Sequence, residues 1–86
     1  MTQQHAIAIG STLIPDPLQI DAGDVVVWQN NTATAETATS DDGGQTFTTG
    51  PIQPNANSLP ISVPTSTAYT VSPAGFQSSI TVNQGG

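Results

Sequence analysis

Apolar and polar residues alternate along this chain in short runs with a period of two residues. Such alternation is typical of β-strands with one face in a core and the other in solvent, and no run has apolar residues at helical spacing over three turns. The expected strands are short and lie at residues 5–9, 18–20, 25–28, 37–39, 59–63, 69–71 and 79–82. The pattern therefore predicts an all-β protein.

Proline, glycine, asparagine and aspartate separate the expected strands. The seven prolines and eight glycines fall mostly between them, where turns need a fixed or a positive φ. Pro60 is an exception, because it lies inside the run 59–63, and a residue that cannot donate a ladder hydrogen bond indicates an edge strand or a bulge. About seven to eight short strands joined by such turns predict a Greek-key β-sandwich.

The length of 86 residues allows one small domain, which we place at residues 1–86 with a flexible tail at 83–86. A chain this short buries only about 60% of its extended surface, which is enough for a single core. Cysteine is absent, so neither disulfides nor thiolate metal ligands are available.

Lysine and arginine are also absent, and six acidic residues give a net charge of −6 at neutral pH. Nucleic acids and anionic membranes are bound largely through cationic side chains, so we expect neither as a partner. The longest apolar run, 25–28, is too short to insert across a bilayer. Residues 1–4 lack the basic and apolar regions of a signal peptide, and we expect none here.

Two motifs carry a family resemblance. Residues 21–30 read Asp-Ala-Gly-Asp-Val-Val-Val-Trp-Gln-Asn and residues 47–54 read Phe-Thr-Thr-Gly-Pro-Ile-Gln-Pro. The first is similar to the cupredoxin entry motif, in which a Gly-Asp turn feeds a buried strand ending in Trp-x-Asn. The second resembles the family element Phe-x-Ser-Gly-x-Leu-x-Pro. The resemblance implies a cupredoxin-like sandwich, and we expect Trp28, Phe47 and Tyr69 to be its core anchors.

The resemblance also locates the positions of the family's copper ligands. The first histidine ligand falls eight residues after the tryptophan, where this chain has Glu36. Counting from the flanking strands places Pro73 at the cysteine position and Phe76 at the methionine position, in a loop roughly three residues shorter than the family's. A type 1 copper site needs a thiolate and two imidazoles, whereas this chain has no cysteine and one histidine. We therefore expect a cupredoxin-like domain without copper, without any other cofactor, and with little change in folding on Glu36→His.

Other candidate sites have ordinary structural interpretations. His5, on the first expected strand, is interpreted as a solvated or hydrogen-bonded residue rather than a metal ligand. Asp41 and Asp42 form either a weak cation loop or a solvated hairpin turn. Asn30-Asn31-Thr32 is either a glycosylation sequon in a secretory context or a loop that matches it by chance.

Catalytic groups are few, because the chain has no cysteine, lysine or arginine, and we expect no enzyme activity. We interpret the chain as a metal-free structural or interaction module, a self-assembling or appended building block of a surface, filament or virion. We expect it outside the cell or on a particle rather than in the cytoplasm. Its expected partner is a protein, including a second copy, because no lysine protects the edge strands against pairing. The alternatives are small-ligand, glycan or cation binding at the end that carries Glu36, Pro73 and Phe76, and an engineered or simplified scaffold.

Overall fold

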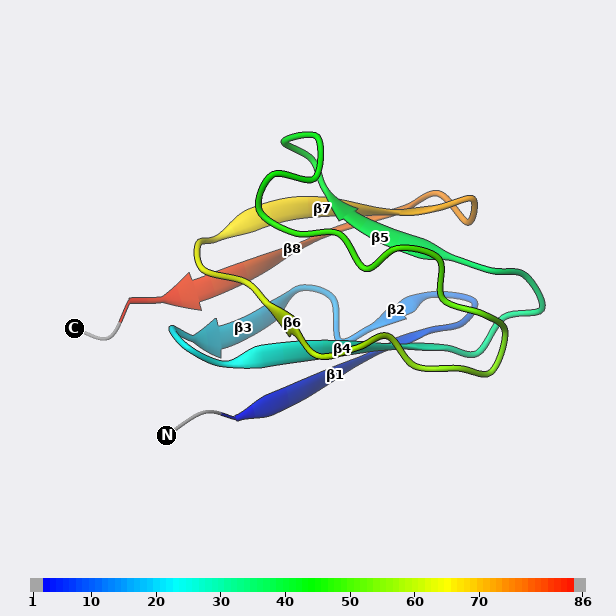
Figure 1. Ribbon diagram of the computed structural model, residues 1–86, viewed down its shortest axis with the longest axis horizontal. Helices are drawn as coiled ribbons and strands as arrows, with labels where there is room; N and C mark the ends of the chain where they lie inside the picture. The colour runs from blue at the N-terminus through cyan, green and yellow to red at the C-terminus, as the bar shows by residue number, and fades with distance from the viewer. Residues whose placement is uncertain (1–2, 85–86) are drawn as a thin grey trace.

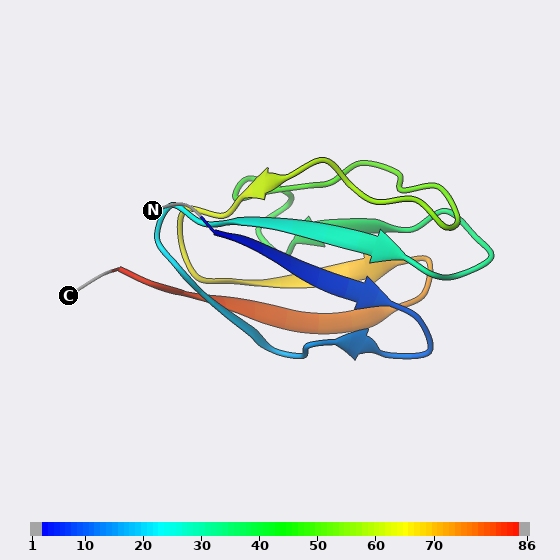
Figure 2. The same cartoon turned by 90° about the horizontal axis from the view of Figure 1, so that it is seen from below.

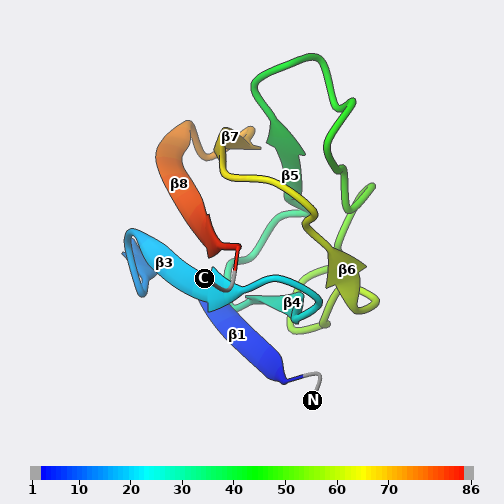
Figure 3. The same ribbon diagram turned by 90° about the vertical axis from the view of Figure 1, so that its left-hand side faces the viewer.

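Eight strands form two four-stranded sheets in the computed structural model, which describes residues 3–84. The sheets lie face to face (Figures 1 and 3), and the prediction of an all-β sandwich is confirmed. No helix long and apolar enough to cross a membrane occurs within these residues. The strands are β1 (Gln4–Ile9), β2 (Leu13–Ile14), β3 (Leu18–Asp21), β4 (Val25–Asn30), β5 (Thr37–Ser40), β6 (Ile61–Ser62), β7 (Thr67–Ser72) and β8 (Phe76–Asn83).

The strand order is β2-β1-β4-β6 in one sheet and β3-β8-β7-β5 in the other. Most neighbours are antiparallel, but β1 pairs with β4 and β3 pairs with β8 in parallel. Figure 2 shows β1 and β4 running side by side in the same direction. Chain neighbours such as β2 and β3 lie in different sheets, so the connections cross between the two layers.

The run 59–63 contributes only the short edge strand β6, as Pro60 predicted. Gln29 pairs with Asn57, and Val26 pairs with Ile61. Between these two pairs, the segment that lies alongside β4 is one residue longer than β4 itself. An extra residue on one strand of an antiparallel pair is a β-bulge. Pro60 therefore lies within a bulge, directly before the edge strand β6.

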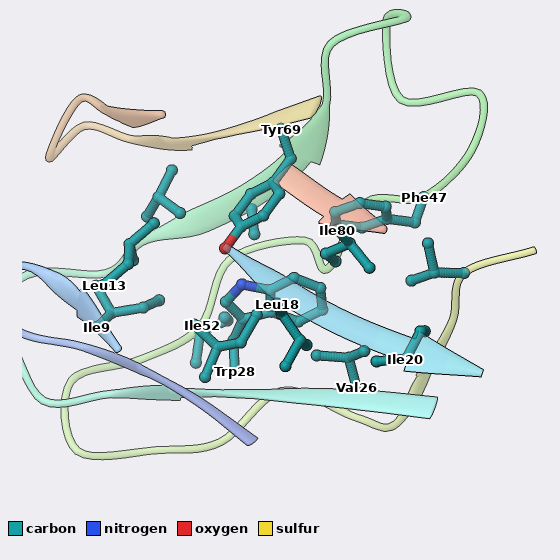
Figure 4. Close-up of a cluster of buried hydrophobic side chains, with 14 of the residues drawn as sticks. Ile9, Leu13, Leu18, Ile20, Val26, Trp28, Phe47, Ile52, Tyr69 and Ile80 are labelled. Atoms are coloured by element: carbon teal, nitrogen blue, oxygen red, sulfur yellow. The ribbon is translucent and has the colours of Figure 1, made fainter. Parts of the chain in front are cut away.

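The core fills the space between the sheets and follows the alternation along each strand. In β4, Val26 and Trp28 are fully buried and contact the core, while Val27 lies on the opposite face of the strand. Figure 4 shows the rings of Trp28, Phe47 and Tyr69 gathered in this core. Trp28 stacks on Phe47 with ring centroids 5.0 Å apart and meets Tyr69 edge-on at 5.6 Å, which are favourable aromatic geometries.

We expected a flexible tail at residues 83–86, but in the structure Asn83 and Gln84 both make contacts. Asn83 is the last residue of β8 and pairs with Asp21 of β3. The Gln84 side-chain amide donates to the Pro64 carbonyl at 3.1 Å. Residues 85–86 of the expected tail lie outside the described residues.

Candidate functional site

The residues that the family resemblance assigns to copper-ligand positions, Glu36, Pro73 and Phe76, lie at one end of the sandwich. We call this end, formed by residues 30–36 and 72–76, the ligand end; it is on the right in Figure 1. Residues 31–36 follow β4 and lead into β5, while residues 72–76 join β7 to β8. The topology therefore brings together two segments that are far apart in the sequence.

Glu36 is the side chain that connects these two segments. It is only 2% exposed, and its Oε1 accepts a hydrogen bond from the Ala74 backbone N–H at 2.9 Å. Its Oε2 accepts from the Thr34 hydroxyl at 2.8 Å. The backbone of Glu36 also exchanges two hydrogen bonds with Ile52, at 3.0 and 2.7 Å. A buried carboxylate is thus held by donors from its own loop and from the 72–76 loop.

This arrangement reverses one expectation for Glu36. A residue this buried, with both carboxylate oxygens accepting hydrogen bonds, cannot be replaced by histidine without leaving donors unpaired. We now expect Glu36→His to destabilise the fold by about 1–3 kcal/mol.

Pro73 and Phe76 contribute no donor atoms to the ligand end. Pro73 is exposed, whereas Phe76 is partly buried and packs against the core. The turn between them is tight, because the Gly75 N–H donates to the Val71 carbonyl at 2.7 Å and Val71 pairs directly with Phe76. The short loop leaves the Ala74 N–H within reach of Glu36.

Asn30 has a structural role at the ligand end that the sequence did not reveal. It is fully buried, and its amide nitrogen donates to the carbonyl oxygens of Thr34 and Ile52, both at 2.8 Å. Its Oδ1 accepts from the backbone N–H and the hydroxyl of Thr32. An amide engaged in this way has no room for a glycan, so the structure contradicts the interpretation of Asn30-Asn31-Thr32 as a used sequon.

A copper site does not fit the residues of the ligand end. Its one buried ionisable group is Glu36, a hard oxygen donor, whereas type 1 copper needs a thiolate and two imidazoles. Within residues 3–84 no three His, Asp or Glu side chains lie close enough to hold a metal ion. The same part of the chain has no pocket.

His5 lies at the opposite end of the sandwich and is paired. Its Nε2 is 2.9 Å from Oδ2 of Asp24, which is only 3% exposed and also accepts the backbone N–H groups of Gln3 and Asp21. The hydrogen bond with His5, followed by that from Gln3, lowers the pKa of Asp24. The interpretation of His5 as a hydrogen-bonded strand residue agrees with this geometry.

Asp41 and Asp42 lie in the turn after β5, where protein donors occupy their carboxylates. Asp42 accepts from the hydroxyls of Ser40 and Thr46 and from the N–H groups of Gln45 and Thr46. These bonds, that of the Ser40 hydroxyl first, lower the pKa of Asp42 to about 2. Asp41 accepts the Thr70 hydroxyl at 2.8 Å. The geometry is that of a hairpin turn stabilised from within.

The mixed sheets, the stacked core around Trp28 and the ligand end together define the cupredoxin fold, which this chain adopts without the copper ligands. Among solved structures, a Cu(I) form of an amicyanin variant superposes with a TM-score of 0.75 at 14% identity, covering 92% of this chain and 81% of that one. Two oxidised amicyanin variants give a TM-score of 0.76 at 14% and 13% identity, with the same coverage. No family model and no curated protein matches the sequence.

Proposed function

We propose that this chain is a metal-free, non-catalytic cupredoxin-like domain that acts as a structural or interaction module. The proposal rests on one observation: the carboxylate of Glu36 binds the Ala74 N–H across the ligand end. In this position a side chain, and not a metal, holds the two loops together. Functional contacts would then be made by the outer surfaces of the sheets.

Small-ligand binding at the ligand end has less support. Its buried polar atoms on Asn30 and Glu36 are already hydrogen-bonded within the protein, and residues 3–84 have no pocket there or elsewhere. A ligand would have to displace these internal hydrogen bonds, each worth about 0.5–1.5 kcal/mol net.

A copper titration of the full chain tests the proposal. Up to several equivalents of Cu²⁺ and Cu⁺ are added while visible absorption and the thermal midpoint are recorded, with His5→Asn as the control for copper binding at the lone histidine. We expect no thiolate-to-copper absorption band. Any shift of the thermal midpoint that copper causes in the wild type should be absent in His5→Asn. Saturable one-to-one binding that persists in His5→Asn and is lost in Glu36→Gln would overturn the proposal.

The structural role of Glu36 is tested with two variants. Glu36→Ala removes both acceptors and leaves the Ala74 N–H without its partner, so we expect a loss of about 1–3 kcal/mol in the free energy of unfolding. Glu36→Gln retains one acceptor oxygen and should lose less. Equal stability of all three proteins in urea unfolding would show that the carboxylate does not hold the loops.

A further inference from the structure

The turn after β5, at the top of Figure 1, contains the only aspartate-glycine pair of the chain, Asp42-Gly43. In such a pair the backbone nitrogen of the glycine can attack the side-chain carboxyl carbon of the aspartate, because glycine has no side chain to obstruct the approach. A C–N bond forms and a C–O bond breaks. The nitrogen loses its proton and the carboxyl group its hydroxyl, which leave as water, and the product is a five-membered succinimide ring.

Hydrolysis of the ring gives two products. Water adds to one of the two ring carbonyls, and the C–N bond of that carbonyl breaks. Opening at the former side-chain carbonyl restores aspartate, whereas opening at the former backbone carbonyl gives isoaspartate. In isoaspartate the main chain passes through the former side-chain carbons, and the free carboxylate is attached directly to Cα. The reaction needs only water, so the pair is a candidate site of covalent modification.

The attacking nitrogen of this pair is uncommitted in the folded protein. Gly43 is exposed, and no hydrogen bond from its N–H is found within residues 3–84. The N–H after Asp21, that of Ala22, donates to a backbone carbonyl at 2.9 Å. The N–H after Asp24, that of Val25, does the same at 3.0 Å. Gly43 therefore differs from the residues that follow these two aspartates.

The carboxylate that would be attacked is restrained by the turn. Oδ1 of Asp42 accepts the backbone N–H groups of Gln45 at 2.9 Å and Thr46 at 3.2 Å, together with the Ser40 hydroxyl. Oδ2 accepts the Thr46 hydroxyl. Ring closure needs a neutral carboxyl group that is free to rotate against the Gly43 nitrogen. The four hydrogen bonds oppose both requirements.

The same hydrogen bonds, that of the Ser40 hydroxyl first, lower the pKa of Asp42 from 3.8 to about 2. Between pH 5 and pH 7 the neutral carboxylic acid is therefore about 60 times rarer in the folded turn than in an unfolded chain. The neutral acid is the form that can release its hydroxyl as water. The folded turn thus lowers the population of the reactive form as well as its freedom to rotate.

We propose that Asp42-Gly43 is a covalent modification site that the folded turn protects, so that succinimide and isoaspartate form after the turn has opened. This inference is independent of the proposed function. Exposed turns open locally at a lower free energy than the whole domain, and Asp42 and Gly43 are both exposed. Once isoaspartate has formed, its carboxylate is displaced from the N–H groups of Gln45 and Thr46. The isoaspartate content of a sample therefore records how long the turn has been open.

Incubation of the full chain at 37 °C and pH 6, in buffer and in 6 M guanidinium chloride, tests this inference. Chymotrypsin cleaves after Trp28 and Phe47 and releases the peptide 29–47. Chromatography separates its aspartyl and isoaspartyl forms, and fragmentation in a mass spectrometer locates the altered residue. We expect isoaspartate at residue 42, formed at least about tenfold more slowly in buffer than in guanidinium chloride.

Two threonines provide a variant and its matched control. Thr46→Val removes a hydroxyl that donates to the Asp42 carboxylate, whereas Thr48→Val removes a hydroxyl that bonds Thr39 instead. We expect Thr46→Val to form isoaspartate several times faster than the wild type in buffer. Thr46→Ser, which keeps the hydroxyl, and Thr48→Val should react at the wild-type rate. In guanidinium chloride all four proteins should react equally, because the turn is absent.

Circular dichroism during the incubation establishes that each variant stays folded. Equal wild-type rates in buffer and in guanidinium chloride would overturn the inference, and this comparison needs no variant. Equal rates for Thr46→Val and Thr48→Val in buffer would overturn it as well, and so would isoaspartate that forms at Asp41 in place of Asp42. None of these outcomes alters the copper titration that tests the proposed function.

Discussion

Two polar atoms in the aromatic core lack hydrogen-bond partners. Trp28 Nε1 and Tyr69 Oη are both buried and make no hydrogen bond of good geometry among the described residues. Figure 4 shows that they point toward one another between the sheets. An unsatisfied buried polar group destabilises a fold by about 1–3 kcal/mol. Burial also raises the pKa of the Tyr69 hydroxyl, which therefore stays neutral across the physiological range.

Tyr69→Phe removes one of these unpaired atoms and keeps the ring that packs against Trp28 and Phe47. We expect the free energy of unfolding to stay unchanged or to rise by about 1 kcal/mol, because no hydrogen bond is lost. Urea unfolding followed by tryptophan fluorescence measures it. A loss of more than about 1 kcal/mol would show that the hydroxyl makes a stabilising contact.

Among the candidate site residues, the sequence located Glu36 but did not reveal its partners. Its position follows from the count after Trp28, whereas its stabilising contact is with the backbone of Ala74, 38 residues further on. Every residue except proline has a backbone N–H, so the residue type of the partner does not reveal such an interaction. The buried amide of Asn30 shows the same limit, because its acceptors are backbone carbonyls.

At the scale of elements, the turn after β5 depends on two glycines with positive φ. Gly43 has a φ of 80° and Gly44 has a φ of 85°, a region in which a side chain costs roughly 1–2 kcal/mol. A Cβ at Gly44 would also lie 3.3 Å from Cγ2 of Thr39, whereas a Cβ at Gly43 would meet nothing within 4 Å.

We therefore expect Gly44→Ala to lower the free energy of unfolding more than Gly43→Ala, which should lose roughly 1–2 kcal/mol. The two variants share the backbone penalty, so their difference isolates the contact with Thr39. Thermal unfolding monitored by circular dichroism measures both. The reverse order would mean that the turn relaxes freely around residue 44.

The same turn should lose stability in acid. The pKa of Asp42 falls from the ordinary 3.8 to about 2 in the folded protein, so its contribution is complete above pH 3.8 and is lost as the pH drops toward 2. Urea unfolding at intervals between pH 5 and pH 2 should show this decline, and Asp42→Asn should show a shallower one. Parallel profiles for both proteins would assign the acid sensitivity to other carboxylates.

Strand prediction was most accurate where apolar alternation is long and least accurate at the short edges. Each segment expected from the pattern overlaps a strand, but β2 was not predicted, because its two residues Leu13 and Ile14 are too short to show alternation. Its pairing comes from β1 and not from local propensity. Conversely, Pro60 predicted either an edge strand or a bulge, because the missing N–H is a local property.

At the scale of the whole molecule, the fold could be predicted and the role of its surfaces could not. The strand count follows from the alternation of apolar and polar residues, whereas the positions of the copper ligands are what the resemblance to the cupredoxin family implies. Only the register shows that Ala8 lies beside Ile14 and Ala6 beside Val27. Side-chain alternation alone does not reveal which strands share a sheet.

The uncompensated charge has a global consequence for stability. The six acidic residues have no lysine or arginine to offset them, and the radius of gyration is 11.9 Å, close to the Debye length of about 10 Å at 0.1 M salt. Folding concentrates carboxylates whose repulsion salt can screen. At pH 8, raising NaCl from 10 to 200 mM should therefore increase the free energy of unfolding, by about 1 kcal/mol or less.

Urea unfolding at the two salt concentrations measures this effect, with His5→Asn as the control that removes the contact between His5 and Asp24. Stability that falls with added NaCl in both proteins would mean that attractive charge interactions outweigh the repulsion.

The bond from Ala74 to Glu36 also bears on how the domain matures. A fold that uses an ion to join two loops reaches full stability only after that ion has been delivered, and it responds to chelators and to competition from other metals. Here the joining group is part of the polypeptide, so its local concentration is fixed at synthesis. The domain should therefore fold equally well in metal-starved and metal-rich surroundings.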